Sequence, residues 1–138
     1  MSNKGNLLAC GTSGGEVQIW DYVQCVKSAT ITAHSRTVSG ICFSNDGLSM
    51  FSSSSSWDPT IRQWLLKDNS LVRTFEGHTS TCYCVVVSID DKSIISGSNE
   101  LIMHNVCDGS ILKKFKGHTD FVHSLALSTY NNVLISGS

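Results

Sequence analysis

Histidine and serine recur along this chain at a fixed spacing, and both residue types can do chemistry. Gly77-His78-Thr79 and Gly117-His118-Thr119 stand 40 residues apart, and they are followed by Ser96-Gly97-Ser98 and Ser136-Gly137-Ser138. Together with an aspartate such as Asp58, these types could form a hydrolase triad, in which histidine takes the proton of a serine nucleophile. However, the sequence has no nucleophile-elbow pattern and repeats the set, whereas an enzyme needs a single site. We therefore expect structural histidines and no catalytic residues.

Cysteines offer a second possible chemistry, metal binding. The six are Cys10, Cys25, Cys42, Cys82, Cys84 and Cys107. No CxxC pair occurs and no second ligand pair has zinc-finger spacing, so we expect no metal site and no cofactor. Without a secretory signal, a disulfide framework is not expected either. Cys82 and Cys84 alternate with Tyr83 in a strand-like run, which predicts that both share the buried face.

Composition narrows the class of protein further. Of 138 residues, 41% are hydrophobic and 15% charged, which indicates a globular chain rather than a disordered one. The net charge is −1 and no basic cluster exceeds Lys113-Lys114, so neither nucleic acid nor a membrane surface is an expected partner. The first six residues are polar and the longest apolar run, 82–87, is too short to span a bilayer. These features predict a cytoplasmic location, with the nucleus as an alternative.

The elements that must position these side chains form a repeat. Residues 72–98 and 112–138 align at an offset of 40 with nine identities in 27 positions. A copy upstream, at an offset of 44, contains Ala33-His34 and Ser52-Ser53-Ser54, and a half-copy begins at residue 7. A fixed period near 40 residues indicates a repeat architecture.

Each repeat is expected to consist of short strands. The predicted strands of one repeat are 81–88, 93–97, 101–105 and 112–115. In the upstream copy, Ser44-Asn45-Asp46-Gly47 predicts a hairpin turn between 41–43 and 48–51. No segment has a helical pattern, and the single proline, Pro59, suits a loop. Four short strands per 40 residues are typical of propeller blades.

The motifs themselves resemble those of WD-repeat β-propellers. The Trp-Asp dipeptide occurs as Trp20-Asp21 and recurs in altered form as Trp64-Leu65 and His104-Asn105. Ala33-His34 and Gly77-His78 precede the second and third of these, and Gly117-His118 begins the next unit. The resemblance covers nearly the whole chain and implies an all-β fold of four-stranded antiparallel blades in an incomplete ring. The expected division is a partial blade at 1–32, blades at 33–76 and 77–116, and the start of another at 117–138.

The resemblance also implies a buried hydrogen-bonded set in each blade, made of histidine, serine or threonine, aspartate and tryptophan. Only one repeat has every member: His34, Ser52 (or Ser54), Asp58 and Trp64. The other repeats are incomplete, and their structural residues are Trp20, His78 and His118. The segment from Ser98 to His104 lacks the aspartate, which predicts a less well tied blade with a tight turn at Asn99-Glu100.

Members of this family bind peptides and proteins mainly across one face. The contacts come from the residue before the turn aspartate and from two residues in the loop that follows each histidine. The corresponding residues here are Trp57, Thr37, Ser39, Thr81, Tyr83, Phe121 and His123. Exposed aromatic residues on loops favour binding, and Trp57 lies in a lengthened loop. Tyr83 and Phe121 have an alternative role, packing on neighbouring loops. Arg36 has no basic neighbour in this set, so a neutral or aromatic peptide is favoured over a phosphopeptide.

Two features remain open at this stage. The serine run 52–56 suits either a bulged strand end, which we favour, or a phosphorylatable linker. About three repeats do not close a ring, so we expect either a fragment of a longer propeller, the favoured alternative, or copies that complete one another by self-association.

The sequence therefore predicts a protein-interaction scaffold or adaptor with protein or peptide partners and no catalysis of its own. The alternative is a substrate-recruiting propeller segment of a larger enzyme or of a ubiquitin-ligase-type assembly.

Overall fold

The computed structural model describes residues 5–55, 57–128 and 133–138, and this part of the chain consists of strands, turns and loops without a helix. Accordingly, the described residues contain no helix long and apolar enough to cross a membrane. The first sheet has the order β1-β2-β3: β1 (Leu7–Gly11), β2 (Glu16–Asp21) and β3 (Val26–Thr32). The second has the order β4-β5-β6-β7: β4 (Val38–Phe43), β5 (Ser49–Ser54), β6 (Ile61–Leu65) and β7 (Ser70–Phe75).

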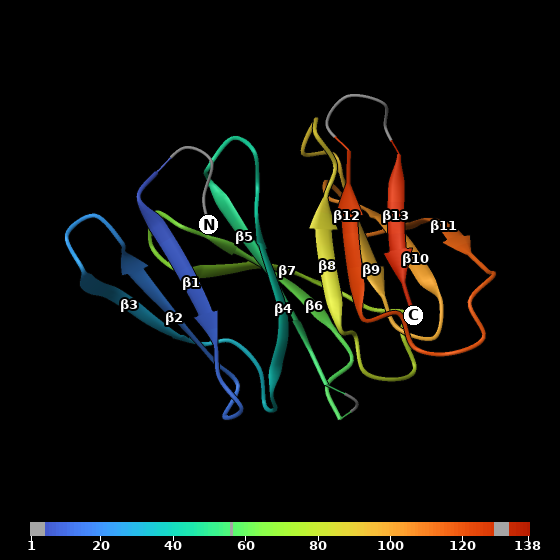
Figure 1. Cartoon of the computed structure of the whole chain (residues 1–138). Coiled ribbons are helices and arrows are strands. Elements are labelled where there is room, and N and C mark those ends of the chain that lie inside the picture. Colours follow the sequence, from blue (N-terminus) through green and yellow to red (C-terminus); the bar gives the residue numbers. More distant parts are fainter. Residues whose placement is uncertain (1–4, 56, 129–132) are drawn as a thin grey trace.

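The third sheet repeats the arrangement of the second, with β8 (Cys84–Val87), β9 (Ser93–Gly97), β10 (Leu101–Asn105) and β11 (Ile111–Phe115). A fourth pairs β12 (Ser124–Leu127) with β13 (Leu134–Gly137). All strand pairs are antiparallel. The sheets stand side by side and do not close into a ring (Figure 1), which confirms the predicted all-β architecture of propeller blades.

Similar turn chemistry forms the first hairpin of the second and third sheets. After β4, the Ser44 hydroxyl accepts a hydrogen bond from Ser49 N–H and donates one to Asp46, and Gly47 takes a positive φ of 75°. After β8, Ser88 makes the matching bonds to Ser93 and Asp90. Glycine adopts a positive φ without the steric cost that a Cβ imposes, so the hairpin predicted at 44–47 forms where its residues favour it.

Apolar side chains fill the three spaces between successive sheets. Val17, Ile31, Met50 and Trp64 belong to the cluster between the first and second sheets. The next two clusters contain Phe51, Phe75 and Ile94, and then Ile95, Leu101 and Val122. The innermost strands β4, β8 and β12 lie against one another in this order. Each sheet therefore depends on its neighbours for burial, as in other repeat proteins.

The strand predicted at 81–88 is shorter in the structure, and the prediction for its cysteines is wrong. β8 begins only at Cys84, because Cys82 N–H bonds to Ser54 of the preceding sheet, 3.0 Å away, instead of to β9. Cys82 packs in the cluster with Phe51, whereas Cys84 packs against the cluster of Val122. The two thiols thus lie on opposite faces of the third sheet. Burial raises the pKa of Cys82 to about 12 and that of Cys84 to about 11, so both remain thiols at neutral pH.

The first three residues of the serine run form part of a strand and not of a linker. Ser52, Ser53 and Ser54 belong to β5 and are fully buried. The expected bulge lies on the neighbouring strand instead, where the register between β4 and β5 shifts between Val38 and Gly40. Residue 56, the last serine of the run, lies outside the described residues. The buried hydroxyls of β5 have no exposed surface to offer a kinase.

Candidate functional site

The four polar side chains of the complete repeat meet in the second sheet. His34 Nδ1 lies 3.2 Å from Asp58 Oδ2, and His34 Nε2 lies 2.9 Å from the Ser52 hydroxyl oxygen. That oxygen also accepts a hydrogen bond from Trp64 Nε1–H over 2.9 Å. Ser52, rather than Ser54, is therefore the member of this set, and all four residues are buried.

The two end groups, Trp64 and Asp58, determine which atom donates in each hydrogen bond that links these four side chains. Trp64 Nε1 can only donate and an ionised Asp58 can only accept, so the neutral imidazole of His34 carries its proton on Nδ1. Ser52 then donates to His34 Nε2. Burial lowers the pKa of His34 more than the nearby Asp58 carboxylate raises it, which favours this neutral form.

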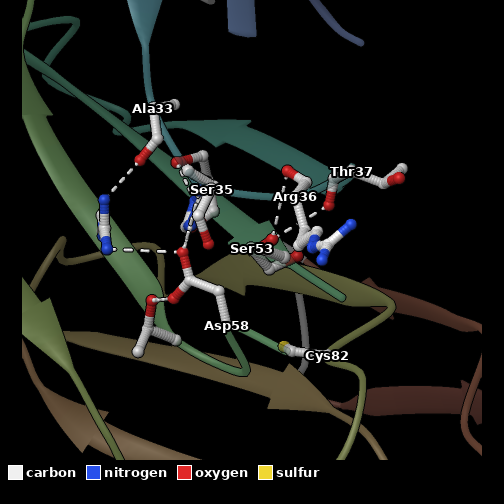
Figure 2. Close-up of polar contacts among 12 residues, drawn as sticks. Ala33, Ser35, Arg36, Thr37, Ser53, Asp58 and Cys82 are labelled. Carbon is white, nitrogen blue, oxygen red and sulfur yellow. Dashed lines mark hydrogen bonds and ion pairs between the residues drawn. The ribbon is translucent and has the colours of Figure 1, made fainter. Parts of the chain in front are cut away.

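Asp58 is the centre of the second half of the network. Its carboxylate accepts hydrogen bonds from the Thr60 hydroxyl at 2.6 Å and from Ser35 N–H at 3.3 Å (Figure 2). Arg62 lies 3.3 Å away and also donates to the Ala33 carbonyl oxygen. Burial alone would raise the pKa of Asp58, but the bonds from Thr60 and Ser35 and the charge of Arg62 lower it. The carboxylate is therefore ionised at neutral pH and ties the β5–β6 loop to the segment before β4.

This connectivity is that of a hydrolase triad, but its surroundings differ. A nucleophilic serine has to reach a substrate, whereas Ser52 is 0% exposed and uses a lone pair of its oxygen for Trp64. The arrangement holds three segments of one sheet together, which is a structural task.

The other sheets contain shortened versions of the network. His78 Nε2 lies 2.7 Å from the Ser96 hydroxyl, and His118 Nε2 lies 2.7 Å from that of Ser136. His104 occupies the position of Trp64 but turns its Nε2 to the carbonyl oxygen of Glu76, 2.9 Å away. Its buried Nδ1 has no hydrogen-bond partner among the described residues. Trp20, half-buried, pairs in register with Leu8 on the neighbouring strand.

Trp57 is the most exposed aromatic side chain among the predicted contact residues. Its exposed fraction is 83%, and the guanidinium carbon of Arg36 lies 6.0 Å from the centre of its ring. This distance is at the outer range of a cation–π interaction. The pair joins the β5–β6 loop to the segment that precedes β4.

A second group of predicted contact residues forms where the third and fourth sheets meet. The Tyr83 ring lies 5.4 Å from that of Phe121 and 4.6 Å from that of His123, both in edge-to-face arrangements. His123 is exposed, whereas Tyr83 and Phe121 are half-buried. The rings thus pack on one another across two loops and still keep accessible surface.

The remaining predicted contact residues are less available. Thr81 is buried and offers little surface to a partner. The Ser39 hydroxyl donates to the Cys82 carbonyl oxygen, and the hydroxyl of the exposed Thr37 donates to Ser13. Ser39 and Thr37 therefore link neighbouring sheets through their hydroxyl groups.

One repeated feature was missed at the sequence level. The fourth residue after each histidine, Val38, Cys82 or Val122, is buried and donates its N–H to the preceding sheet. The acceptors are the carbonyl oxygens of Thr12, Ser54 and Ser98. The fixed offset from histidine was visible in the sequence, but the mixture of valine and cysteine concealed it.

Both aromatic groups lie at one end of the sheets. Trp57 follows β5, whose last residue, Ser54, pairs with Val38 at the start of β4. Tyr83 and Phe121 precede β8 and β12, which follow β4 in the row of inner strands. We call the surface formed by Arg36, Trp57, Tyr83, Phe121 and His123 the loop face. Among the described residues, no three His, Cys, Asp or Glu side chains are grouped so as to hold a metal ion.

Comparison with known proteins identifies the repeats. The family described as "WD domain, G-beta repeat" matches residues 24–64, 69–104 and 109–138. WD repeat and SOCS box-containing protein 1 of Xenopus tropicalis is 34% identical over 91 residues, which are 65% of this chain and 21% of that protein. Protein FIZZY-RELATED 1 of Arabidopsis thaliana is 34% identical over 98 residues, covering 70% and 20%. E3 ubiquitin-protein ligase COP1 of Pisum sativum is 32% identical over 105 residues, covering 73% and 15%.

The chain spans about a fifth of the length of the first two of these relatives. The three matched segments cover most of the chain and contain the strands from β3 to β13, apart from the last residue of β10. By its repeats and its blades, the chain belongs to the WD40 family.

Proposed function

We propose that this chain is part of a protein-interaction scaffold that binds peptide segments of its partners through the loop face and has no catalysis of its own. The observation that carries the proposal is Trp57, a large apolar side chain that is 83% exposed beside Arg36. Tryptophan, tyrosine and arginine are the residues most enriched at binding hot spots. Tyr83, Phe121 and His123 extend the same surface across the third and fourth sheets.

The charges of the loop face favour a neutral or aromatic peptide. Phosphopeptide pockets use several arginines, which bind the phosphate in a bidentate manner. Arg36 is the arginine of this surface, and its guanidinium already lies beside the Trp57 ring. An apolar or aromatic side chain of the partner gains more here, because it covers ring surface that water otherwise contacts.

Substitution of Trp57 tests this proposal. Peptides selected from a random display library on the wild-type chain should bind Trp57→Ala about thirtyfold more weakly, the loss of a hot-spot side chain of about 2 kcal/mol. Isothermal titration calorimetry measures the affinities, and thermal unfolding verifies that the variant is folded.

Tyr22→Ala is the matched control, because Tyr22 is exposed in the turn between β2 and β3, at the opposite end of the sheets. Its affinity for the same peptides should equal that of the wild type. The proposal fails if the selection yields no specific peptide, or if the selected peptides bind folded Trp57→Ala as tightly as the wild-type chain.

A second candidate function is recruitment of substrates within a ubiquitin-ligase-type assembly. Two of the relatives favour it, since one is named as a SOCS box-containing protein and another as an E3 ubiquitin-protein ligase. If this candidate is right, protein captured with the full chain from cells should become ubiquitinated when E1, E2, ubiquitin and ATP are added. Capture without ubiquitination would leave the scaffold as the better proposal. The cytoplasmic or nuclear location expected from the sequence remains part of both proposals.

A further inference from the structure

The third sheet lacks the carboxylate around which the second sheet is organised. In the second sheet, His34 Nδ1–H and Ser35 N–H both donate to Asp58 Oδ2, over 3.2 and 3.3 Å. Asp58 lies in the six-residue segment between β5 and β6. The corresponding segment between β9 and β10 has three residues, 98–100, and contains no aspartate. The shorter connection removes the acceptor but retains the histidine.

His78 is left with one ring nitrogen unused. The residue is 8% exposed, and its Nε2 bonds to the Ser96 hydroxyl as His34 does to Ser52. Its Nδ1 makes no hydrogen bond to any residue that the structure describes. This nitrogen is therefore available to a hydrogen-bonding group from outside the chain. By analogy with His34, Nδ1 faces the place that Asp58 fills in the second sheet.

A cavity of about 310 Å³ lies beside His78 and the β9–β10 connection. Thr79, Asn99, Glu100 and Lys116 are among the residues that line it. Thr79 follows His78 as Ser35 follows His34, so its N–H is the counterpart of the second donor to Asp58. Glu100 is engaged by Lys114 at 2.8 Å, whereas Lys116 forms no ion pair within the described part of the chain. The cavity therefore has donors and one uncompensated positive charge.

We infer that this cavity receives an aspartate or glutamate side chain of a partner peptide, whose carboxylate takes the position that Asp58 takes in the second sheet. The inference rests on the proposed peptide-binding function and adds a second, acidic recognition element to it. A carboxylate matches the site because its single charge can be balanced by Lys116. Its oxygens can accept hydrogen bonds from the His78 imidazole N–H and the Thr79 backbone N–H. A doubly charged phosphate calls for more cationic partners than Lys116 supplies.

The experiment titrates the isotope-labelled full chain with two short blocked peptides, acetyl-Gly-Asp-Gly-amide and its asparagine counterpart, and follows the imidazole NMR signals. The signals of His78 are identified by their loss in His78→Gln. The aspartate peptide should shift them and bind about tenfold more tightly than the asparagine peptide, because a charge-assisted bond replaces a neutral one. Equal binding of both peptides, or unchanged His78 signals, would overturn the inference.

Two variants of the short β9–β10 connection sharpen the test. Asn99→Asp supplies an internal carboxylate beside the cavity and should weaken the aspartate peptide at least tenfold, whereas Asn99→Ser should not. If inorganic phosphate at equal ionic strength binds more tightly than the aspartate peptide, the site is a phosphate site and the inference is wrong. Because this titration reads His78 and the display experiment reads Trp57, failure of one leaves the other result interpretable.

Discussion

Replacing Ser52 with alanine should lower the free energy of unfolding by about 3 kcal/mol. The hydroxyl of Ser52 donates to His34 Nε2 and accepts from Trp64 Nε1–H. No other side chain among the described residues joins these two atoms. Both partners are nearly fully buried, so loss of the hydroxyl leaves one donor and one acceptor away from water. Each such group costs about 1–3 kcal/mol. Urea unfolding of the full chain, followed by tryptophan fluorescence, measures the change.

Ser53→Ala is the matched control for this prediction. Ser53 is the next residue of β5 and is equally buried, but its hydroxyl bonds are weak: 3.4 Å to the Ser39 hydroxyl, 3.5 Å to the Gly40 carbonyl oxygen, and one to the Cys82 thiol. We expect a loss below about 1 kcal/mol for this variant. Equal effects of the two substitutions would show that burial, and not the hydrogen-bonded chain, sets the cost.

Ser52→Ala also distinguishes a structural role of His34, Ser52 and Asp58 from a catalytic one. A hydrolase would lose activity in Ser52→Ala while its stability stayed close to that of the wild type. A structural network predicts the reverse, a less stable chain and no hydrolysis to lose. The burial of the Ser52 hydroxyl and its bond from Trp64 are the reasons for expecting the second result.

Acid should destabilise this chain well above the pH at which carboxylates titrate. Burial lowers the pKa of His78 from 6.5 to about 4, with smaller contributions in the same direction from His104 and Lys114 and an opposing one from Glu100. Between these two pH values the unfolded chain binds a proton that the folded chain does not, so stability falls as the pH falls from 6.5 to about 4. At about 1.4 kcal/mol per pKa unit, His78 alone accounts for about 3 kcal/mol.

His34 and His104 add to this loss, because burial lowers the pKa of each. Urea unfolding at several pH values between 7 and 4 should therefore show a steady decrease in stability. His78→Gln removes one titrating group and should flatten the profile by about 3 kcal/mol over this range. Phe51→Leu, a substitution in the apolar core, should lower stability by a constant amount at every pH. A profile that His78→Gln leaves unchanged would contradict the prediction.

Much of the fold was predictable because its determinants are local. The hairpin at 44–47 follows from its serine, aspartate and glycine, and the period of 40 to 44 residues follows from motifs that recur in each sheet. The short turn at Asn99-Glu100 was likewise visible, since Leu101 has to begin the next strand so soon after Ser98. Spacing along the chain is enough for such features, because turn geometry depends on a few adjacent residues.

The composition of the site was less accessible to the same reasoning. Thr81 belongs to the predicted contact set by its position after a histidine, yet it is buried. Tyr83 and Phe121 were equally compatible with binding and with packing, and the structure places their rings against each other while part of each remains exposed. Sequence position identifies the loop in which a side chain stands, but the neighbouring loop decides how much of it is covered.

The sequence by itself determined the repeat and the all-β blades, and its family resemblance indicated His34, Asp58 and Trp64 as network residues, with Ser52 and Ser54 as alternatives. Only the tertiary structure decided that Cys82 and Cys84 face opposite sides of the third sheet, and that a cavity replaces the missing aspartate beside His78. The physical reason is that alternation assigns faces only within a strand whose start is known. Where a strand starts depends on bonds to another sheet, such as that from Cys82 to Ser54, and these join residues far apart in the chain.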